Sequence, residues 1–155
     1  MVVRSAGLLM FRKRDGLEFL LVHPGGPFWA KKDLGAWSIP KGEYGAGADP
    51  LEAAFREFEE EIGVPPQPGG ELLALGEVRQ PGGKVVTAWA FEGNCDEASI
   101  RSNAFSMEWP KGSGRMREFP EVDRAAWFGL EEARKKILKG QVAFLDRVFD
   151  AIRPI

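Results

Sequence analysis

Apolar residues fall in short runs along the chain, separated by breaks rich in glycine and proline. The runs at 5–11 and 18–23 have strand length and are joined by the polar turn RKRDG, so they predict two adjacent strands. Further strands are predicted at 36–40, 72–79, 84–93, near the end of 94–110, and at 125–128. The basic, glycine-containing segment 111–123 is predicted to be a long loop.

The clearest helix lies between Asp49 and Gly63. Asp49 is a favourable N-cap, and Pro50 fits the first helical position. Glu52, three residues after Asp49, completes a capping box, and Gly63 provides the stop. The apolar residues at helical spacing predict a buried stripe made of Leu51, Ala54, Phe55, Phe58 and Ile62.

Two helical stretches, at 130–140 and 140–153, are predicted to close the chain. Strands followed by a helix, further strands and terminal helices predict an α+β fold or a layered α/β/α sandwich. The length of 155 residues fits a single domain. The apolar face of the last stretch covers either the sheet or a partner subunit, so a monomer and a homodimer are both open.

Charge and cysteine content narrow the setting of the protein. A net charge of −2 provides no basic field for a long nucleic acid or an anionic membrane. Cys95 is the single cysteine, which excludes an intrachain disulfide and fits a reducing compartment. The apolar run near the N-terminus is far too short for a membrane span. A soluble, cytoplasmic domain is therefore expected.

The segment FREFEEEIGV, residues 55–64, contains four glutamates. On a helical wheel, Glu57, Glu60 and Glu61 fall on one arc beside the buried stripe, whereas Glu59 falls on the opposite flank. Three convergent carboxylates with no histidine or thiol nearby suit a hard cation such as Mg²⁺ or Mn²⁺. For the glutamate run taken alone, a solvated acidic face is the alternative interpretation.

The segment from WSIPKGEY to the glutamate-rich helix resembles the Nudix hydrolase family. The family's box is a glycine, five residues, a glutamate, seven residues, Arg-Glu-apolar, one residue, Glu-Glu, one residue, and Gly-apolar. The matching residues, within 42–64, are Gly42, Arg56, Glu57, Phe58, Glu60, Glu61, Gly63 and Val64. One position departs, because Ala48 replaces the first box glutamate. The resemblance implies a single Nudix domain over residues 1–155, an α/β/α sandwich around a mixed sheet with the box as a loop and a helix.

The resemblance also implies a chemistry. Family members hydrolyse a nucleoside diphosphate linked to another group, by attack of water on phosphorus with the help of a divalent cation, here Mg²⁺ or Mn²⁺. On the matching positions, Glu57, Glu60 and Glu61 are expected to bind the cation. The carbonyl of Gly42 is a further candidate ligand. Glu57 or Glu60 is expected to be the general base, and Arg56 to orient a catalytic glutamate.

Charged side chains outside the helix are candidates for contact with a substrate. Lys41 adjoins the box and could meet a phosphate, with a solvated loop lysine as the alternative. Arg115 and Arg117, with Lys111, occupy the segment 111–123, which could close over phosphates. For each of these three, a plain solvated position is the alternative.

Glu121 precedes the late strand in a region where some family members supply another metal ligand or base. Glu108 and Glu118 are its rivals for that role. His23 is the single histidine, and a hydrogen-bonded loop histidine explains it more readily than catalysis does. A lone histidine does not support a zinc site.

Five tryptophans are many for this length, so some are expected to do more than fill the core. Trp109, Trp29 and Phe28 sit beside predicted loops and are candidates for stacking on a nucleotide base. Trp89 and Trp127 lie in apolar strands and are expected to pack in the interior.

The expected substrate is a small nucleotide. The short form and the PKGE start of the box resemble members that cleave dinucleoside polyphosphates and nucleoside triphosphates. An ADP-ribose or dinucleotide-coenzyme pyrophosphatase is an alternative, and so is a catalytically weak domain that senses a nucleotide. Ala48 favours the sensing domain, whereas the intact glutamates favour an enzyme. A structural domain with an acidic helix would show no Mg²⁺-dependent nucleotide binding.

Overall fold

A computed structural model describes residues 2–152. In chain order its elements are β1 (Arg4–Lys13), β2 (Leu17–Pro24), β3 (Lys41–Glu43), α1 (Pro50–Ile62), β4 (Leu73–Arg79), β5 (Val85–Glu92), the 3₁₀ turn η1 (Glu97–Ser99), β6 (Ala104–Glu108), β7 (Met116–Pro120), β8 (Val122–Gly129), α2 (Leu130–Lys136), the 3₁₀ turn η2 (Lys139–Gln141) and α3 (Val142–Ile152). Arg153, which the sequence places at the end of the last helix, lies outside the described residues.

The centre of the fold is a mixed sheet in the order β4-β5-β1-β2-β8. β1 and β5 are parallel, and the other pairs along this path are antiparallel. β3 pairs with the start of β1, at residues 5–7, while β2 pairs with the end of β1, at residues 11–13. β2 and β3 therefore share one edge of β1 and diverge between the two pairings.

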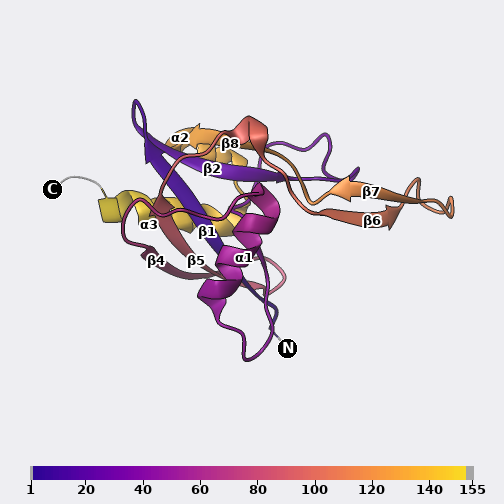
Figure 1. The fold of residues 1–155 in the computed structure, drawn as a ribbon, viewed down its shortest axis with the longest axis horizontal. Coiled ribbons are helices and arrows are strands. Elements are labelled where there is room, and N and C mark those ends of the chain that lie inside the picture. Colours follow the sequence, from indigo (N-terminus) through magenta and orange to yellow (C-terminus); the bar gives the residue numbers. More distant parts are fainter. Residues whose placement is uncertain (1, 153–155) are drawn as a thin grey trace.

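Helices cover both faces of this sheet, with α1 on one face and α2 and α3 on the other (Figure 1). Leu9 and Phe11 of β1 face the core beneath α2 and α3, while Leu8 and Met10 face the core beneath α1. A strand that is buried on both faces needs apolar residues at every position, which explains the continuous apolar runs. The predicted α/β/α sandwich around a mixed sheet is confirmed.

The prediction of a long loop at 111–123 is wrong. β6 and β7 pair as a separate antiparallel hairpin, and β8 already begins at Val122. This hairpin extends away from the central sheet (Figure 1). Most of its strand residues are exposed, so no burial pattern of period two marked it in the sequence.

The predicted strand at 36–40 is replaced by two isolated bridges, and the regular strand β3 starts one residue later, at Lys41. The predicted helix at 130–140 ends at Lys136, because Ile137 turns extended and is fully buried. Ile137 pairs there with Trp37, which joins this end of α2 to the segment that leads into the box.

Helix α1 begins and ends where the sequence predicts. Pro50 is its first residue, and Gly63 closes it with a left-handed φ of 98°. The expected capping box is absent, since Asp49 occupies the N-cap position without a side-chain hydrogen bond to the helix. Leu51 and Phe55 of the predicted stripe are half-buried. The buried residues are Ala53, Ala54, Phe58, Glu61 and Ile62, so the stripe is rotated toward the glutamates.

Candidate functional site

Gly42 and Glu57 are in direct contact where β3 passes α1. Gly42 is the central residue of β3 and pairs with Ala6 of β1. A Cβ atom on Gly42 would lie 2.1 Å from the carboxyl carbon of Glu57, so only a glycine leaves room for this carboxylate. The fold thus places a box glutamate against the backbone of the box glycine.

Glu61 lies on the inner side of the same helix face and is 9% exposed. Burial raises the pKa of the Glu61 carboxyl to about 8, and the nearby Glu57 charge adds to this shift. Lys41 opposes the shift with its charge and with a backbone hydrogen bond. Burial in turn lowers the pKa of the Lys41 ammonium, and the Glu61 charge partly restores it. A buried carboxyl and a half-buried ammonium thus interact through their charges beside the box glycine.

The metal-free protein is expected to lose stability as the pH rises from about 5 to 8. The pKa of Glu61 is about 8 in the folded protein against 4.5 for an ordinary glutamate, so the folded state holds this proton more tightly than the unfolded state. The bound proton stabilises the folded state fully at a pH below the pKa of Glu61 in the unfolded chain. This stabilisation disappears as the pH rises through the pKa of Glu61 in the folded protein, and the free energy of unfolding falls by at most about 1.4 kcal/mol per pH unit. Melting temperatures in EDTA would show the slope, and Glu61→Gln should flatten it; equal slopes in both proteins would contradict the assignment.

Arg56 bridges the two remaining box glutamates. Its Nη2 donates to Oε2 of Glu57 at 3.2 Å, and its Nε lies 3.9 Å from Oε1 of Glu60. Burial raises the pKa of the Glu57 carboxyl, the Arg56 hydrogen bond opposes this, and the Glu60 charge adds to it. The arginine side chain is 54% exposed and has both carboxylates as partners, while Ala48 is exposed in the loop before the helix. The pairing of Arg56 therefore does not depend on an acid at residue 48.

Restoring the box glutamate by Ala48→Glu is expected to change turnover by less than about fivefold, because an exposed ion pair contributes at most about 1 kcal/mol. Position 48 is exposed, and Arg56 is already paired with Glu57 and Glu60. Steady-state rates of the two proteins at equal metal concentration would check this. A gain well above tenfold would instead show that the missing acid limits the wild-type protein.

Glu121, the residue before β8, interacts with the charges of the box glutamates. Its backbone N–H donates to the Asn103 carbonyl at 2.8 Å, which fixes the base of the hairpin. Partial burial raises the pKa of the Glu121 carboxyl, and the Glu60 charge adds to the shift. Its rivals lie elsewhere: Glu108 accepts hydrogen bonds from two backbone N–H groups of the hairpin turn, and Glu118 is exposed on β7.

A cavity of ≈ 200 Å³ opens beside these groups. It is lined by Val22, Pro24, Trp29, Ala36, Ser38, Ile39, Lys41, Glu61, Glu121, Val122 and Leu138. Its lining combines an aromatic ring, an ammonium group and two carboxyl groups, and its position is the divergence of β2 and β3. A larger cavity of ≈ 560 Å³ lies under the C-terminal end of α1 and includes none of the carboxylates named above.

The donor set of this region fits a hard divalent cation. The metal ligands that α1 and Glu121 can provide are all carboxylate oxygens. Gly42, which contacts Glu57, can provide its backbone carbonyl oxygen as a further ligand. Over residues 2–152, however, no three Asp, Glu, His or Cys side chains are already gathered as a metal cluster. Glu57 and Glu60 instead turn toward Arg56.

A family model described as a NUDIX domain matches residues 1–148 of the chain. The chain belongs to the NUDIX family. Members of this family generally use divalent metal ions, which agrees with the oxygen donors gathered by the box. Among residues 2–152 of this NUDIX protein, no helix is both long and apolar enough to cross a membrane.

Two curated relatives and one solved structure resemble this NUDIX chain. An RNA pyrophosphohydrolase of Rhodospirillum rubrum is 42% identical over 54 residues, 33% of this chain and 33% of that protein, so the chain spans a third of its length. The asymmetrical bis(5'-nucleosyl)-tetraphosphatase of Mus musculus is 28% identical over 144 residues, covering 86% of this chain and 83% of the relative. The Ap4A hydrolase of C. elegans in a binary complex has a TM-score of 0.64 at 23% identity, covering 97% and 98% of the two chains, which shows a shared fold.

The hairpin residues predicted to bind substrate are not brought to the cavity. Arg115 and Arg117 are exposed, and the Arg117 guanidinium lies 5.7 Å from the centre of the Phe119 ring. Trp109 contacts Phe28 edge to face, with ring centres 6.3 Å apart. Their part in substrate binding stays a prediction. Trp89 and Trp127 are partly buried against the core, as predicted.

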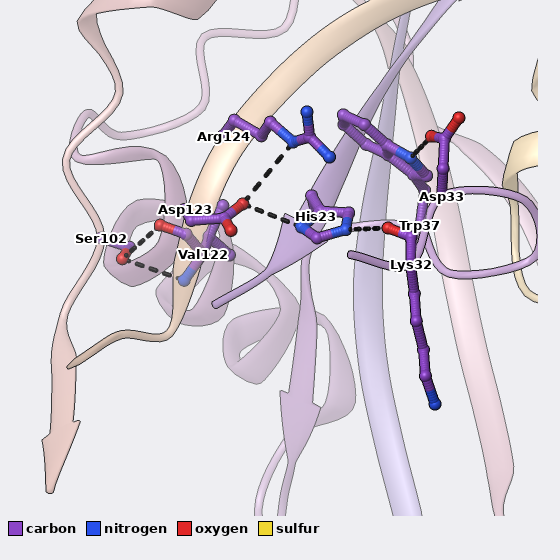
Figure 2. Close-up of polar contacts among 8 residues, drawn as sticks. All are labelled: His23, Lys32, Asp33, Trp37, Ser102, Val122, Asp123 and Arg124. Atoms are coloured by element: carbon purple, nitrogen blue, oxygen red, sulfur yellow. Dashed lines mark hydrogen bonds and ion pairs between the residues drawn. The ribbon is translucent and has the colours of Figure 1, made fainter. Parts of the chain in front are cut away.

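His23 is hydrogen-bonded, but it lies at the end of β2 and not in a loop. Figure 2 shows it between Asp123 of β8 and Lys32, which belongs to the segment 25–35, called loop 25–35 below. Sequence reasoning missed Asp123, because it falls in the segment taken for a flexible loop. The sequence does carry one signal for it: if a strand is assigned here, Asp123 and Glu121 are two residues apart and therefore point to the same face.

Proposed function

We propose that this NUDIX protein is a divalent-metal-dependent hydrolase that cleaves a phosphoric anhydride bond in a nucleotide. The observation that carries the proposal is a cavity lined by Lys41, Glu61 and Glu121, with the charge of Glu57 close enough to act on both of these carboxyl groups. Each of the three carboxyl groups has a raised pKa that depends on burial and on a neighbouring carboxylate. Ionisable groups perturbed by both effects in a cleft are characteristic of functional sites.

The proposed ligands of the ion are Glu57, Glu60 and Glu61, with the Gly42 carbonyl, and the proposed ion is Mg²⁺ with Mn²⁺ as a substitute. When bound, such an ion neutralises phosphate charge and makes a bound water more acidic. The residues of the chain supply the positioning. Arg56 holds Glu57 in place with its hydrogen bond of 3.2 Å.

Glu57 is the first candidate for the general base, with Glu60 as the second. The raised pKa of the Glu57 carboxyl brings it closer to the neutral range in which a carboxylate accepts a proton from water most effectively. Lys41, which lines the same cavity as Glu61, is the proposed contact for a phosphate of the substrate. A cation next to carboxylates also reduces the repulsion that an anionic substrate would meet there.

The proposed substrate is a dinucleoside polyphosphate or a nucleoside triphosphate. The mouse relative, whose match covers most of both chains, is a bis(5'-nucleosyl)-tetraphosphatase. The cavity of ≈ 200 Å³ is smaller than the roughly 300–1000 Å³ that encloses a drug-sized ligand. We therefore expect it to enclose only one part of a nucleotide, with the Trp29 ring as an aromatic wall. The phosphates would then lie outside it, near the box residues.

A phosphate- and product-resolved screen tests the proposal. The purified protein would be incubated with Mg²⁺ or Mn²⁺ and with ATP, GTP, damaged nucleoside triphosphates, diadenosine tetraphosphate, ADP-ribose or NADH, with Glu60→Gln as the control. Turnover of the polyphosphates that disappears in the control would support it. Turnover confined to ADP-ribose or NADH would replace the substrate class. Metal-independent nucleotide binding without turnover would favour a sensing domain.

We extend the proposal to a single domain over residues 1–155 in a cytoplasmic setting. Phe144, Leu145 and Val148 of α3 are fully buried in the core against the sheet, so this part of the apolar stretch covers the protein's own interior, whereas Phe149 is exposed. A monomer and a homodimer both stay open.

A further inference from the structure

His23 is a buried side chain that the proposed hydrolysis does not use. It is 0% exposed and packs edge-on against the Trp37 ring, with centroids 5.1 Å apart. Nε2 lies 2.6 Å from the carbonyl oxygen of Lys32, and Nδ1 lies 2.9 Å from Oδ1 of Asp123 (Figure 2). A carbonyl oxygen only accepts hydrogen bonds, so Nε2 donates to Lys32, while Nδ1 is hydrogen-bonded to the Asp123 carboxyl group. The imidazole therefore joins two segments of the chain that are far apart in sequence.

Lys32 connects His23 to one wall of the cavity. Its backbone N–H donates to the Trp29 carbonyl at 2.9 Å, and its Nζ lies 5.1 Å from the centre of the Trp29 ring. Trp29 lines the cavity beside the carboxylates. The bond from His23 to the Lys32 carbonyl thus holds the turn that carries this aromatic ring.

Asp123 connects His23 to a second part of the cavity wall, because Glu121, which lines the cavity, lies two residues before it on the same segment. Loop 25–35 starts in contact with that segment as well. The N–H of Gly25 donates to the Glu121 carbonyl at 2.9 Å, and a Cβ on Gly25 would lie 1.9 Å from the Pro120 carbonyl oxygen. The loop is therefore fixed to the Glu121 segment at its first residue by backbone and near its end by the His23 side chain.

We propose that His23 is a positioning residue that sets the separation of two parts of the cavity wall, the turn that carries Trp29 and the segment that carries Glu121. A ring of similar size without donors would fill the same space, but it would leave the Lys32 carbonyl and the Asp123 carboxylate without their shared partner. Loop 25–35 would then move relative to β8. The consequence for substrate binding rests on the proposed function, whereas the consequence for the loop does not.

The first test measures the loop itself. Backbone amide exchange by mass spectrometry is expected to accelerate roughly tenfold across loop 25–35 in His23→Phe, as for the loss of one hydrogen bond. Phe19→Leu is the matched control, because Phe19 is a fully buried residue of the same strand that lies in the core beneath α2 and α3. It should lower the melting temperature without this local acceleration. Unchanged exchange in His23→Phe, or equal acceleration in the control, would overturn the proposal.

The second test uses the nucleotide that the wild-type protein hydrolyses fastest. His23→Phe is expected to raise KM about tenfold while kcat changes less than about threefold, since the cavity wall moves and the box carboxylates stay in place. A fall in kcat with unchanged KM would contradict a role in wall position. If the wild type hydrolyses no nucleotide, the proposed function fails, and the exchange measurement still decides the position of the loop.

The third test exploits Asp123, whose side chain is 34% exposed, so that its variants are expected to fold even if His23→Phe does not. Asp123→Ala should reproduce the loop exchange and the KM of His23→Phe, whereas Asp123→Asn keeps an acceptor oxygen and should remain near wild type. The double variant His23→Phe/Asp123→Ala should be no worse than either single variant, because both remove the same link. Additive effects, or an Asp123→Asn variant as impaired as Asp123→Ala, would refute the bridge.

Discussion

Replacement of Glu57 by glutamine is expected to lower turnover by about a thousandfold, within the 10²–10⁴ range of a lost general base. The substitution removes a proposed ligand and the first candidate base in one step, while it preserves the shape of the side chain. The melting temperature of the metal-free protein should stay the same or rise. Burial and the Glu60 charge hold the pKa of the Glu57 carboxyl above its usual value, and a neutral amide is free of both penalties.

The matched control for Glu57→Gln is Glu59→Gln. It makes the same chemical change on the same helix, at an exposed position on the opposite flank, and should leave kcat unchanged. Rates at saturating Mg²⁺, with melting curves for each protein, make the comparison. A Glu57 variant that retains more than about a tenth of wild-type turnover would move the general base to another residue, with Glu60 and Glu121 next.

Gly42→Ala is expected to lower turnover about a hundredfold with little loss of stability. The new methyl group would lie 2.1 Å from the carboxyl carbon of Glu57, so this carboxylate must move by more than about 1 Å to restore contact distance. A misplacement of about 1 Å in a catalytic group can cost about a hundredfold in rate. The displaced atoms are the far end of a flexible side chain, so the fold itself has room to adjust.

Gly45→Ala is the control for this prediction. Gly45 lies in the same segment before α1, and a Cβ there would meet nothing within 4 Å. Steady-state rates together with Mg²⁺ titrations of the two alanine variants would separate a displaced carboxylate from a general effect of alanine in this segment. Near-normal turnover in Gly42→Ala would show that the observed contact with Glu57 is not needed for catalysis.

Helices and strands whose buried residues recur with a regular period were predictable from the sequence. Helix α1 was predictable because its apolar spacing, Pro50 and Gly63 agree, and the two faces of β1 explain an unbroken apolar run. The hairpin of β6 and β7 was not predictable, because its residues are mostly exposed and carry no periodic signal. Local patterns describe burial, and this element has little of it.

The features of the site that the sequence did not predict also depend on contacts that a local pattern does not describe. Spacing on a helix identified the face that carries Glu57, Glu60 and Glu61, but it did not show that Glu61 is buried, since its burial depends on how α1 packs in the folded protein. The choice of Glu121 over its rivals likewise depends on a long-range bond, from its N–H to the Asn103 carbonyl. Contacts between distant segments are not encoded in the periodicity of either segment.

The divergence of β2 and β3 along β1 separates the two halves of the site. The box carboxylates lie on the β3 side, where Gly42 pairs with Ala6, while loop 25–35 follows the end of β2 and contributes Trp29 to the cavity wall. Changes of length or sequence in this loop would alter the shape of the cavity without shifting the strand pairs on either side. In evolutionary terms, the choice of nucleotide and the hydrolytic step can therefore change independently, and relatives that share the box are free to accept different substrates.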